Sequence, residues 1–217
     1  QEIIELEKYR DLAESIKHNT KGDKLLTALK EGFSKMDIKA NQKAIIFTES
    51  TRTQNYLFNL LSEHYPDKIV LFNGSNTDAT SNKVYKNWLS QNKGTDKVTG
   101  SPTADKRAAL VEHFRDEATI MIATEAAAEG INLQFCSLLI NYDLPWNPQR
   151  IEQRIGRVHR YGQEFDVVVV NFLNASNAVE ARVFELLNQK FKLFEGVFGS
   201  SDEVLGSIES GVDFENR

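Results

Sequence analysis

The hydrophobic residues of this chain are concentrated in five short runs separated by longer stretches of mixed character. The runs are Ala44–Thr48, Lys68–Phe72, Ile120–Thr124, Leu138–Tyr142 and Val167–Phe172. Each run is nearly continuous in apolar residues and does not alternate with polar ones, which is typical of parallel strands buried on both faces of a sheet. We therefore predict five buried strands at these positions.

Helical spacing of apolar residues occurs between these runs. It covers Thr51–Glu63, Ala104–Arg115 and Pro148–Arg160, and Pro148 suits the first turn of a helix. Because strands and helices alternate along the chain, the pattern predicts an α/β fold with an open, doubly wound, mostly parallel sheet and flanking helices.

Three further segments flank or interrupt the predicted sheet. The first predicts two helices broken near Asn19–Asp23. The second is rich in Asn, Thr, Ser, Lys and Gly around a helical patch at Val84–Leu89, and the third begins with an amphipathic helix at 177–195 and ends in a loose tail. We therefore expect an N-terminal helical flank at 1–37, a lobe at 38–175 with a surface insertion at about 76–105, and a C-terminal helix and tail at 176–217.

Composition is that of a soluble globular domain. The 217 residues are 41% hydrophobic and 26% charged, and no apolar run approaches the roughly 20 residues of a membrane span. The first residues are polar and predict no signal peptide, and the one cysteine, Cys136, cannot form a disulfide framework. We expect a cytoplasmic protein without a membrane partner, in which Cys136 is a small buried residue.

Polar groups follow the carboxyl ends of four predicted strands, where open parallel sheets bind their ligands. These groups are Thr48, Glu49, Ser50, Thr51 and Arg52 after the first strand, Asn73, Gly74 and Ser75 after the second, Thr124 and Glu125 after the third, and Asp143 after the fourth. They predict one shared binding edge. The alternative is that they are ordinary polar turn residues, because strand ends meet solvent.

Four arginines fall within eleven residues of the last predicted helix, although the net charge of the chain is −5. They are Arg150, Arg154, Arg157 and Arg160. At about 100° per residue they share an arc of roughly 120° with Gln153, apart from the apolar stripe of the same helix. Guanidinium groups keep their charge and bind phosphate bidentately, so this face predicts a bound anion. The alternative is a solvated face paired with acidic groups elsewhere in the fold.

The chain lacks the loop that holds ATP phosphates in a self-sufficient ATPase. It has no GxxxxGK[ST] sequence, no strand ending in a metal-holding acidic pair, and no metal-ligand spacing among its four histidines. Asp116-Glu117-Ala118-Thr119 spells a helicase box but precedes a predicted strand, so we interpret it as a helix-to-strand turn. The sequence thus predicts an arginine face that binds an anion without a nucleotide cradle of its own.

Four segments of the chain, spread over residues 43–174, resemble the motifs of one enzyme family in order and spacing. NYDLPWNPQRIEQRIGRVHRYGQ at 141–163 is similar to the last helicase motif of Swi/Snf-like superfamily-two enzymes, particularly their bacterial RapA-type branch. ATEAAAEGINLQF at 123–135, IIFTES at 45–50 and LFNGS at 71–75 are similar to earlier motifs of the second lobe of these enzymes.

The resemblance implies a RecA-like fold and a role as the second of two lobes, with ATP and Mg²⁺ held by a first lobe outside this chain. By match to the motifs, Arg157 and Arg160 would be catalytic arginine fingers, and Gln153 would read the nucleotide or position them. The other residues implied near the nucleotide are Glu129, Gly130 and Asn132, and those implied on a nucleic-acid backbone are Thr48, Ser50, Thr51, Arg52, Asn73, Gly74, Thr124 and Glu125.

We therefore hypothesise that the whole protein is an ATP-dependent translocase that remodels a protein bound to duplex nucleic acid, DNA rather than RNA, and that this fragment alone is inactive. The alternatives are a noncatalytic nucleic-acid- or protein-binding module that retained the fold, and a self-contained phosphoryl-transfer enzyme, which the missing cradle disfavours. The sequence departs from the family at Ala126–Ala128, where two glycines are common, so we expect a more helical turn there. Trp146 could stack on a base, but beside two prolines we expect it to be a packing anchor.

Overall fold

Five parallel strands form one open sheet in the order β2–β3–β1–β4–β5. The computed structural model describes residues 2–15, 19–37, 39–125, 130–159, 163–173, 181–183 and 185–186. The strands are β1 (Ala44–Thr48), β2 (Ile69–Phe72), β3 (Ile120–Thr124), β4 (Leu138–Asn141) and β5 (Val168–Asn171). Each lies within one residue of its predicted bounds, and the predicted parallel α/β sheet is confirmed.

The register of the sheet aligns the carboxyl ends of the strands. Thr48 at the end of β1 pairs with Thr124 at the end of β3, and Phe47 pairs with Asn141 at the end of β4. Because every strand runs the same way, the segments that follow them meet at one edge. We call this the strand-end edge and define it as residues 48–52, 73–75, 124–125 and 143.

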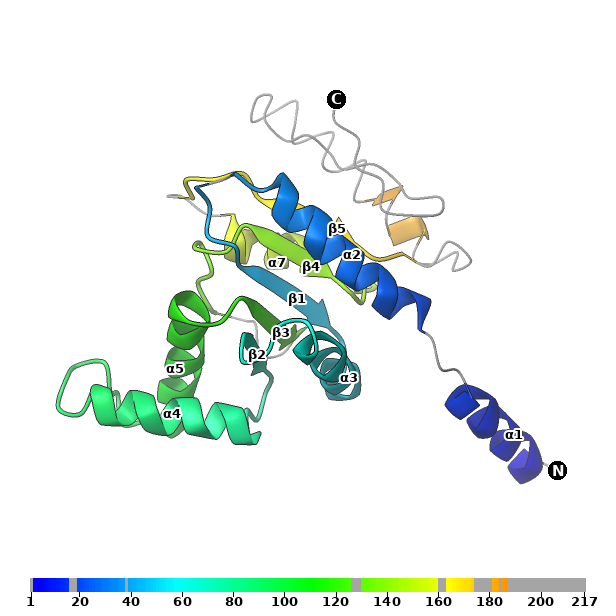
Figure 1. Ribbon diagram of the computed structural model, residues 1–217, viewed down its shortest axis with the longest axis horizontal. Coiled ribbons are helices and arrows are strands. Elements are labelled where there is room, and N and C mark those ends of the chain that lie inside the picture. The colour runs from blue at the N-terminus through cyan, green and yellow to red at the C-terminus, as the bar shows by residue number, and fades with distance from the viewer. Residues whose placement is uncertain are drawn as a thin grey trace.

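Helices cover both faces of the sheet (Figure 1). Leu29 and Leu57 pack with the strand side chains of one face, and Phe114 and Val158 pack with those of the other. The helices are α1 (Glu2–Ser15), α2 (Thr20–Lys35), α3 (Thr51–Ser62), α4 (Ala79–Gln91), α5 (Pro102–Asp116) and α7 (Pro148–Val158). Thus α2 and α3 lie on one face, and α5 and α7 on the other.

The N-terminal flank is divided by a helix cap. The side chain of Asn19 accepts hydrogen bonds from the backbone N–H groups of Lys21 and Gly22, so α2 begins at Thr20. The amino end of α2 therefore lies at the Asn19–Asp23 segment near which the sequence predicts the break. Unlike a free flank, α2 belongs to the main core, because Leu25 and Leu29 have no exposed surface.

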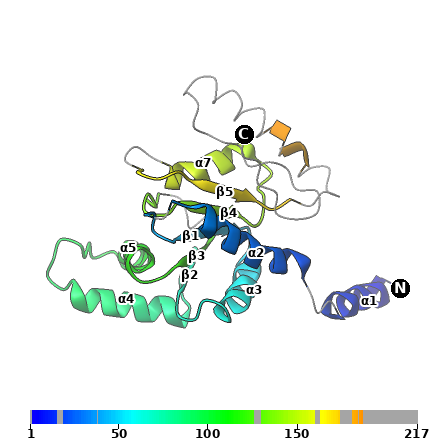
Figure 2. The same ribbon diagram turned by 45° about the horizontal axis from the view of Figure 1, so that its top comes forward.

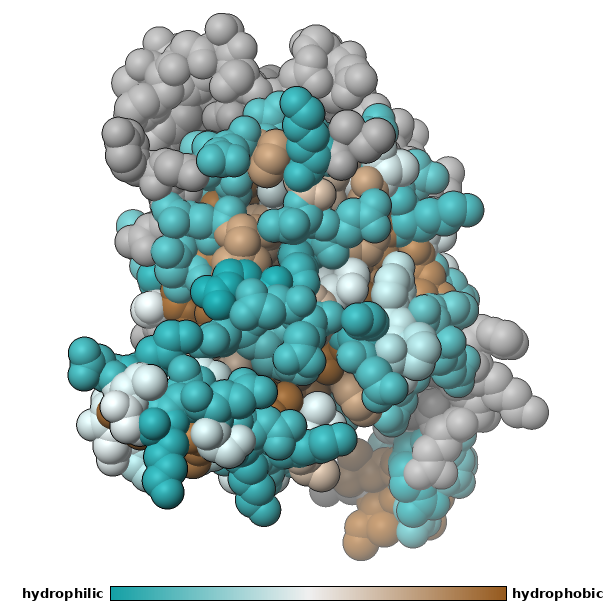
Figure 3. All heavy atoms as spheres, turned by 60° about the vertical axis from the view of Figure 1, so that its left-hand side comes forward, coloured by the Kyte–Doolittle hydropathy of each residue, from teal (hydrophilic) through white to brown (hydrophobic). Residues whose placement is uncertain are grey.

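The insertion between β2 and α5 is more regular than its composition predicts. Asp78 caps α4 by accepting a 2.8 Å hydrogen bond from the backbone N–H of Ser81, so the helix extends well beyond the predicted patch. Trp88 is buried against α5 and its indole N–H donates to the Glu112 carboxylate at 3.0 Å. The outer surface on this side of the molecule is mainly hydrophilic (Figure 3).

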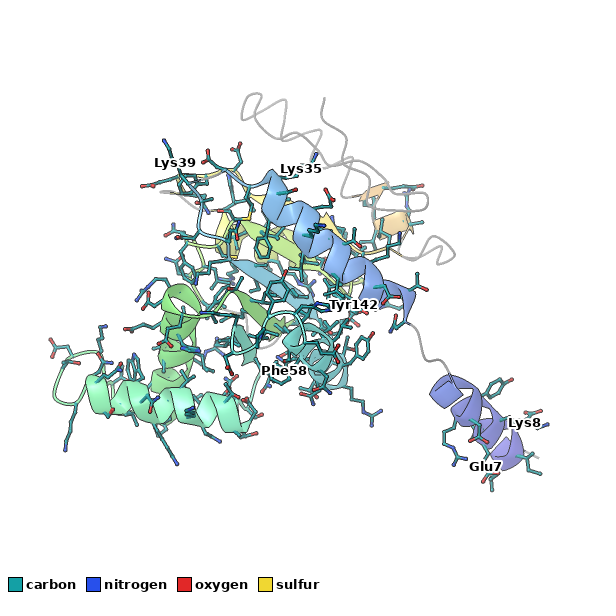
Figure 4. All side chains as sticks on the ribbon, viewed as in Figure 1. Glu7, Lys8, Lys35, Lys39, Phe58 and Tyr142 are labelled. Atoms are coloured by element: carbon teal, nitrogen blue, oxygen red, sulfur yellow. The ribbon has the colours of Figure 1, made fainter. Side chains whose placement is uncertain are left out.

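The first helix stands apart from the rest of the lobe in both ribbon views (Figures 1 and 2). Its Glu7 and Lys8 point away from the other elements (Figure 4), and its apolar Ile3 and Leu6 are exposed as well. Within the parts of the chain that the structure describes, no helix is long and apolar enough to span a membrane.

Only a small part of the predicted C-terminal helix is described. Residues 181–183 and 185–186 are helical, and Val183 is buried against Leu144 and Ile151. The remainder of the predicted helix at 177–195, and the tail after it, lie outside the described residues.

Candidate nucleotide and nucleic-acid site

Arg154 is buried at the centre of the candidate site. Only 2% of the residue is exposed. Its Nη1 donates to the Asn141 side-chain oxygen at 2.8 Å and to the Asp143 carbonyl at 3.1 Å, while Nε and Nη2 donate to the Glu125 carboxylate. The guanidinium group lies 4.8 Å from the centre of the Phe47 ring. Each nitrogen of the guanidinium group therefore has a hydrogen-bond partner within the lobe.

This environment corrects the helical-wheel prediction, which placed Arg154 on one exposed face with Arg150, Arg157 and Arg160. The wheel describes one helix alone and cannot show that Glu125 arrives from the end of β3. Burial lowers the pKa of the Arg154 guanidinium, and the charge and hydrogen bonds of Glu125 oppose that change. An arginine stays protonated in proteins, so Arg154 presents a buried positive charge to the partly exposed Glu125 carboxylate.

The other arginines of α7 differ in their surroundings. Arg150 and Gln153 are exposed and Arg157 is half-buried. Among the described residues, no carboxylate forms an ion pair with Arg150 or Arg157. Internal pairing thus accounts for Arg154, whereas Arg157 has no carboxylate partner in the part of the chain that the structure describes. Arg160 lies outside the described residues.

A short loop packs against the last turn of α7. The backbone N–H of Leu133 donates to the carbonyl of Arg157 at 3.0 Å. Gly130 has a φ of +81°, which favours glycine, and apart from its chain neighbours no described residue lies within 4 Å of the place where a Cβ would be. Asn132 bonds to the nearby Gln134 side chain at 3.1 Å. The loop that carries Gly130 and Asn132 therefore meets the last turn of α7 at Leu133, whereas Glu129 and Ala126–Ala128 lie outside the described residues.

Asp143 ties three segments together at the strand-end edge. Its carboxylate accepts hydrogen bonds from the Thr48 hydroxyl at 2.6 Å, the Glu49 backbone N–H at 3.1 Å and the Lys21 ammonium at 3.0 Å. The Lys21 ammonium also lies over the ring of Tyr142, and Figure 4 shows Tyr142 near the start of α2. Burial alone raises the pKa of Asp143, but the hydrogen bonds and the charge of Lys21 outweigh it, so the pKa is lowered.

The end of β2 is held by a buried amide that sequence reasoning missed. Gln54 has no exposed surface, and its Nε2 donates to the carbonyls of Phe72 and Ile122. Its oxygen accepts from Asn73 at 2.9 Å, and Asn73 in turn accepts from the backbone N–H of Ser75. Gln54 lies on the predicted α3 helix, and only its spacing with Leu57 and Leu61 signals that it faces inward.

The remaining predicted nucleic-acid contacts differ in exposure. Ser50 caps α3 by accepting a hydrogen bond from a backbone N–H in its first turn, and it is exposed. Thr51, Arg52 and Gly74 are also exposed, whereas Thr124 is buried, as is Thr48. The strand-end edge therefore has an outer layer of exposed residues that is accessible to a ligand. The buried residues form an inner layer that supports the outer one.

Three other predictions can be compared with the structure. The helix-to-strand turn is confirmed, because α5 ends at Asp116 and β3 begins at Ile120. Cys136 is a buried small residue as expected, and burial raises the pKa of its thiol to about 12. Trp146 is 76% exposed, so the expected packing anchor is wrong: the prolines beside it fix the loop without covering the indole.

Comparison with known proteins identifies the family. The model of the helicase conserved C-terminal domain matches residues 53–162. The chain belongs to this helicase C-terminal family. The match includes α3 from its third residue onward, the insertion, the β3 and β4 segments and the whole of α7, so the helicase domain contains most of the candidate site.

The helicase domain has similar relatives in bacteria. The chain is 43% identical over 145 residues to the ATP-dependent helicase YqhH of Bacillus subtilis (strain 168), covering 66% of this chain and 25% of that protein. It is 42% identical over 83 residues to the RNA polymerase-associated protein RapA of Vibrio cholerae serotype O1 (strain M66-2), covering 37% of this chain and 9% of that protein. The resemblance to the RapA-type branch is confirmed, and the chain spans a quarter or less of these relatives.

Solved structures confirm the RecA-like fold of a helicase C-terminal lobe. The C-terminal part of the Fun30 ATPase domain matches with a TM-score of 0.54 and 23% identity, covering 78% of this chain and 47% of that one. The C-terminal domain of the DEAD-box protein Dbp5 matches with a TM-score of 0.52 and 21% identity, covering 79% and 78%. At these identities the likeness concerns the fold alone.

Proposed function

We propose that this helicase domain is the second motor lobe of an ATP-dependent translocase that remodels protein bound to duplex DNA. The observation that carries the proposal is that the arginines of α7 differ in whether a carboxylate of the lobe pairs with them. Arg154 is neutralised inside the lobe, whereas Arg157 has no carboxylate partner among the described residues. A guanidinium group with no carboxylate partner in the described part of its chain suits a phosphate supplied from outside.

In this proposal, Arg157 and Arg160 act as arginine fingers on ATP bound to a first lobe, which also holds Mg²⁺. Cationic donors placed on the charge that develops at a transferred phosphoryl group accelerate transfer by about 10³–10⁵. The exposed, left-handed Gly130, in the loop that contacts α7 through Leu133, leaves room for a ligand to approach. The supporting residues near the nucleotide are Glu129, Gly130, Asn132 and Gln153.

The strand-end edge is proposed to hold a nucleic-acid backbone. Thr51 and Arg52 are exposed there, with Ser50, and so is Gly74 after β2. Hydroxyls, backbone N–H groups and arginine bind phosphate without reading sequence, as movement along a strand requires. Duplex DNA is the proposed substrate. The name of RapA, an RNA polymerase-associated protein, supports a DNA-bound protein complex as the kind of partner that is remodelled.

The proposal also assigns parts to the rest of the chain. Residues 38–175 form the lobe, and the flank at 1–37 supports it through α2. The segment at 176–217 follows the lobe, and the insertion at 76–105 extends from its side through α4. The first lobe is expected in the remainder of a longer protein, since YqhH is about four times as long as the matched region.

The test is ATP turnover with and without duplex DNA. We expect the fragment to be inactive and the full-length protein to be stimulated by DNA. Full-length Arg157→Ala and Arg160→Ala should each lose about 10³-fold or more in kcat. Full-length Arg115→Ala, which alters an exposed arginine paired with Asp116, serves as the control. If the full-length protein is inactive, or if the arginine-finger variants turn over ATP as fast as wild type, a noncatalytic binding module becomes the better account.

A further inference from the structure

The carboxylate of Glu125 is an unexpected group at an edge proposed to bind phosphates. It would repel a nucleic-acid backbone if it faced one. In the structure it instead accepts hydrogen bonds from Nε and Nη2 of Arg154, and its own side chain is 21% exposed. Its carboxylate therefore serves to pair with the buried guanidinium group of Arg154 within the lobe.

We infer that Arg154 is a positioning residue that couples the strand-end edge to α7, and that Glu125 acts through Arg154 and does not touch nucleic acid. This inference rests on the proposed function, because it concerns how that function's two sites communicate. It reassigns Glu125, which the sequence motifs placed among the nucleic-acid contacts.

The geometry of the guanidinium group carries the inference. Its donors reach Glu125 after β3, Asn141 at the end of β4 and the carbonyl of Asp143 in the loop that follows. These donors have fixed directions in one plane, so the side chain cannot follow one acceptor and keep the others unless the backbone moves with it. A shift of the strand ends against one another is therefore transmitted to α7.

The same network reaches the outer layer of the edge. The Asp143 carboxylate holds the Thr48 hydroxyl and the Glu49 backbone N–H, directly before the exposed residues of α3. On the other side, Arg157 follows Arg154 by one turn on α7, and its carbonyl accepts from Leu133. One buried side chain thus lies between the residues proposed to grip nucleic acid and the guanidinium group proposed to reach ATP.

A purely structural role of the Glu125–Arg154 pair would give a different result from a positioning role. Removing one partner of a buried ion pair destabilises a protein, but replacing both partners by neutral groups can restore its stability. If Arg154 serves only to hold the lobe together, activity should recover together with stability. If it positions α7, activity should stay low in a double variant that is stable.

The experiment uses the full-length protein and its Glu125→Gln, Arg154→Met and double variants, with Arg115→Met as the matched control at an exposed ion pair. The measurements are Tm, the Kd for duplex DNA over a salt series, the KM for ATP and the DNA-stimulated kcat. We expect the double variant to regain Tm relative to the less stable single variant, and its stimulated kcat to stay about 10²-fold below wild type. The Kd for DNA should be unchanged in all three.

Two outcomes would overturn the inference while leaving the proposed function intact. The first is a stimulated kcat that recovers with Tm in the double variant. The second is tighter DNA binding by Glu125→Gln, as expected if removing its charge relieves a direct repulsion of phosphate. If full-length wild type has no ATPase activity, or Arg157→Ala retains it, the proposed function fails and the coupling role fails with it.

Discussion

Asp143 illustrates how much one side chain can organise at the end of a strand. Its carboxylate binds a hydroxyl from β1, a backbone N–H from the next residue and an ammonium group from α2. Its carbonyl accepts from Arg154. The partners satisfy the partly buried carboxylate and fix the end of β4 relative to β1 and α2. Charge-assisted hydrogen bonds of this kind are shorter and stronger than neutral ones.

We predict that Asp143→Asn lowers the stability of the folded chain by about 1–3 kcal/mol at neutral pH, because the charged acceptor is lost. Burial works to raise the pKa of Asp143, but the hydrogen bonds and Lys21 lower it below its usual 3.8. A lowered pKa in the folded state gives stabilisation that is complete above the unfolded value and is lost as pH falls through the folded value.

The free energy of unfolding in urea, measured from about pH 7 to about pH 2, tests this prediction. Below pH 3.8 the wild type should lose stability more steeply than Asp143→Asn. Lys21→Met removes one of the three partners of the Asp143 carboxylate, so it should lower the free energy of unfolding at neutral pH by less than Asp143→Asn does. If wild type and Asp143→Asn have parallel pH profiles, the carboxylate does not hold the edge in the way described.

At the scale of single residues, the sequence predicts which residue types lie at the site better than it predicts the role of each. Arg154 and Arg157 are equivalent on a helical wheel, but only Arg154 meets Glu125 and Asn141, which arrive from two other strands. Lys21 is another example, since its partner Asp143 is 122 positions away in the chain. Contacts of this kind depend on the tertiary fold and leave no periodic signal.

Among the elements, α2 shows how closely a flanking helix can approach the sheet. Gly32 lies over Leu138 of β4, and a Cβ at this position would be 2.8 Å from the Leu138 side chain. Leu138 is fully buried in a close-packed core and has little room to move. The absence of a side chain on Gly32 is thus what lets the two backbones approach.

We predict that Gly32→Ala destabilises the chain by about 1–3 kcal/mol through overpacking, although alanine is the better helix former. Ser34→Ala, at an exposed position of the same helix, is the matched control and should leave stability unchanged or slightly higher. Urea unfolding of both variants provides the comparison. A Gly32→Ala variant as stable as Ser34→Ala would contradict the described packing of α2.

The elements also differ in how well the sequence predicts them. The five strands are predicted to within one residue because burial on both faces requires continuous apolar runs. The extent of α4 is not, since its buried side relies on Ser81 and Trp88 within a polar sequence. The same applies to α2, whose core position depends on a sheet that lies later in the chain. Apolar periodicity locates elements, whereas their neighbours determine which of them join the core.

At the scale of the whole molecule, an acidic chain is proposed to bind a polyanion. The net charge of −5 disfavours nonspecific binding over the entire surface. At the strand-end edge, however, Glu125 is neutralised by Arg154 and Asp143 is paired with Lys21, while Arg52 is exposed. Internal pairing of Glu125 and Asp143 therefore leaves this edge more favourable to phosphate than the net charge suggests, although Glu49 in the same edge is exposed.

We predict that DNA affinity depends on a few localised charges. Each phosphate contact contributes about −0.9 to the slope of log K against log salt concentration. In the full-length protein, Arg52→Ala should weaken duplex binding and reduce the steepness of the slope by about 0.9. Lys39→Ala removes the same charge from an exposed position before the amino end of β1, away from α3 (Figure 4), and should leave the slope unchanged. If both variants lower the affinity equally, the chain responds to DNA through its overall charge, and the strand-end edge is not the binding surface.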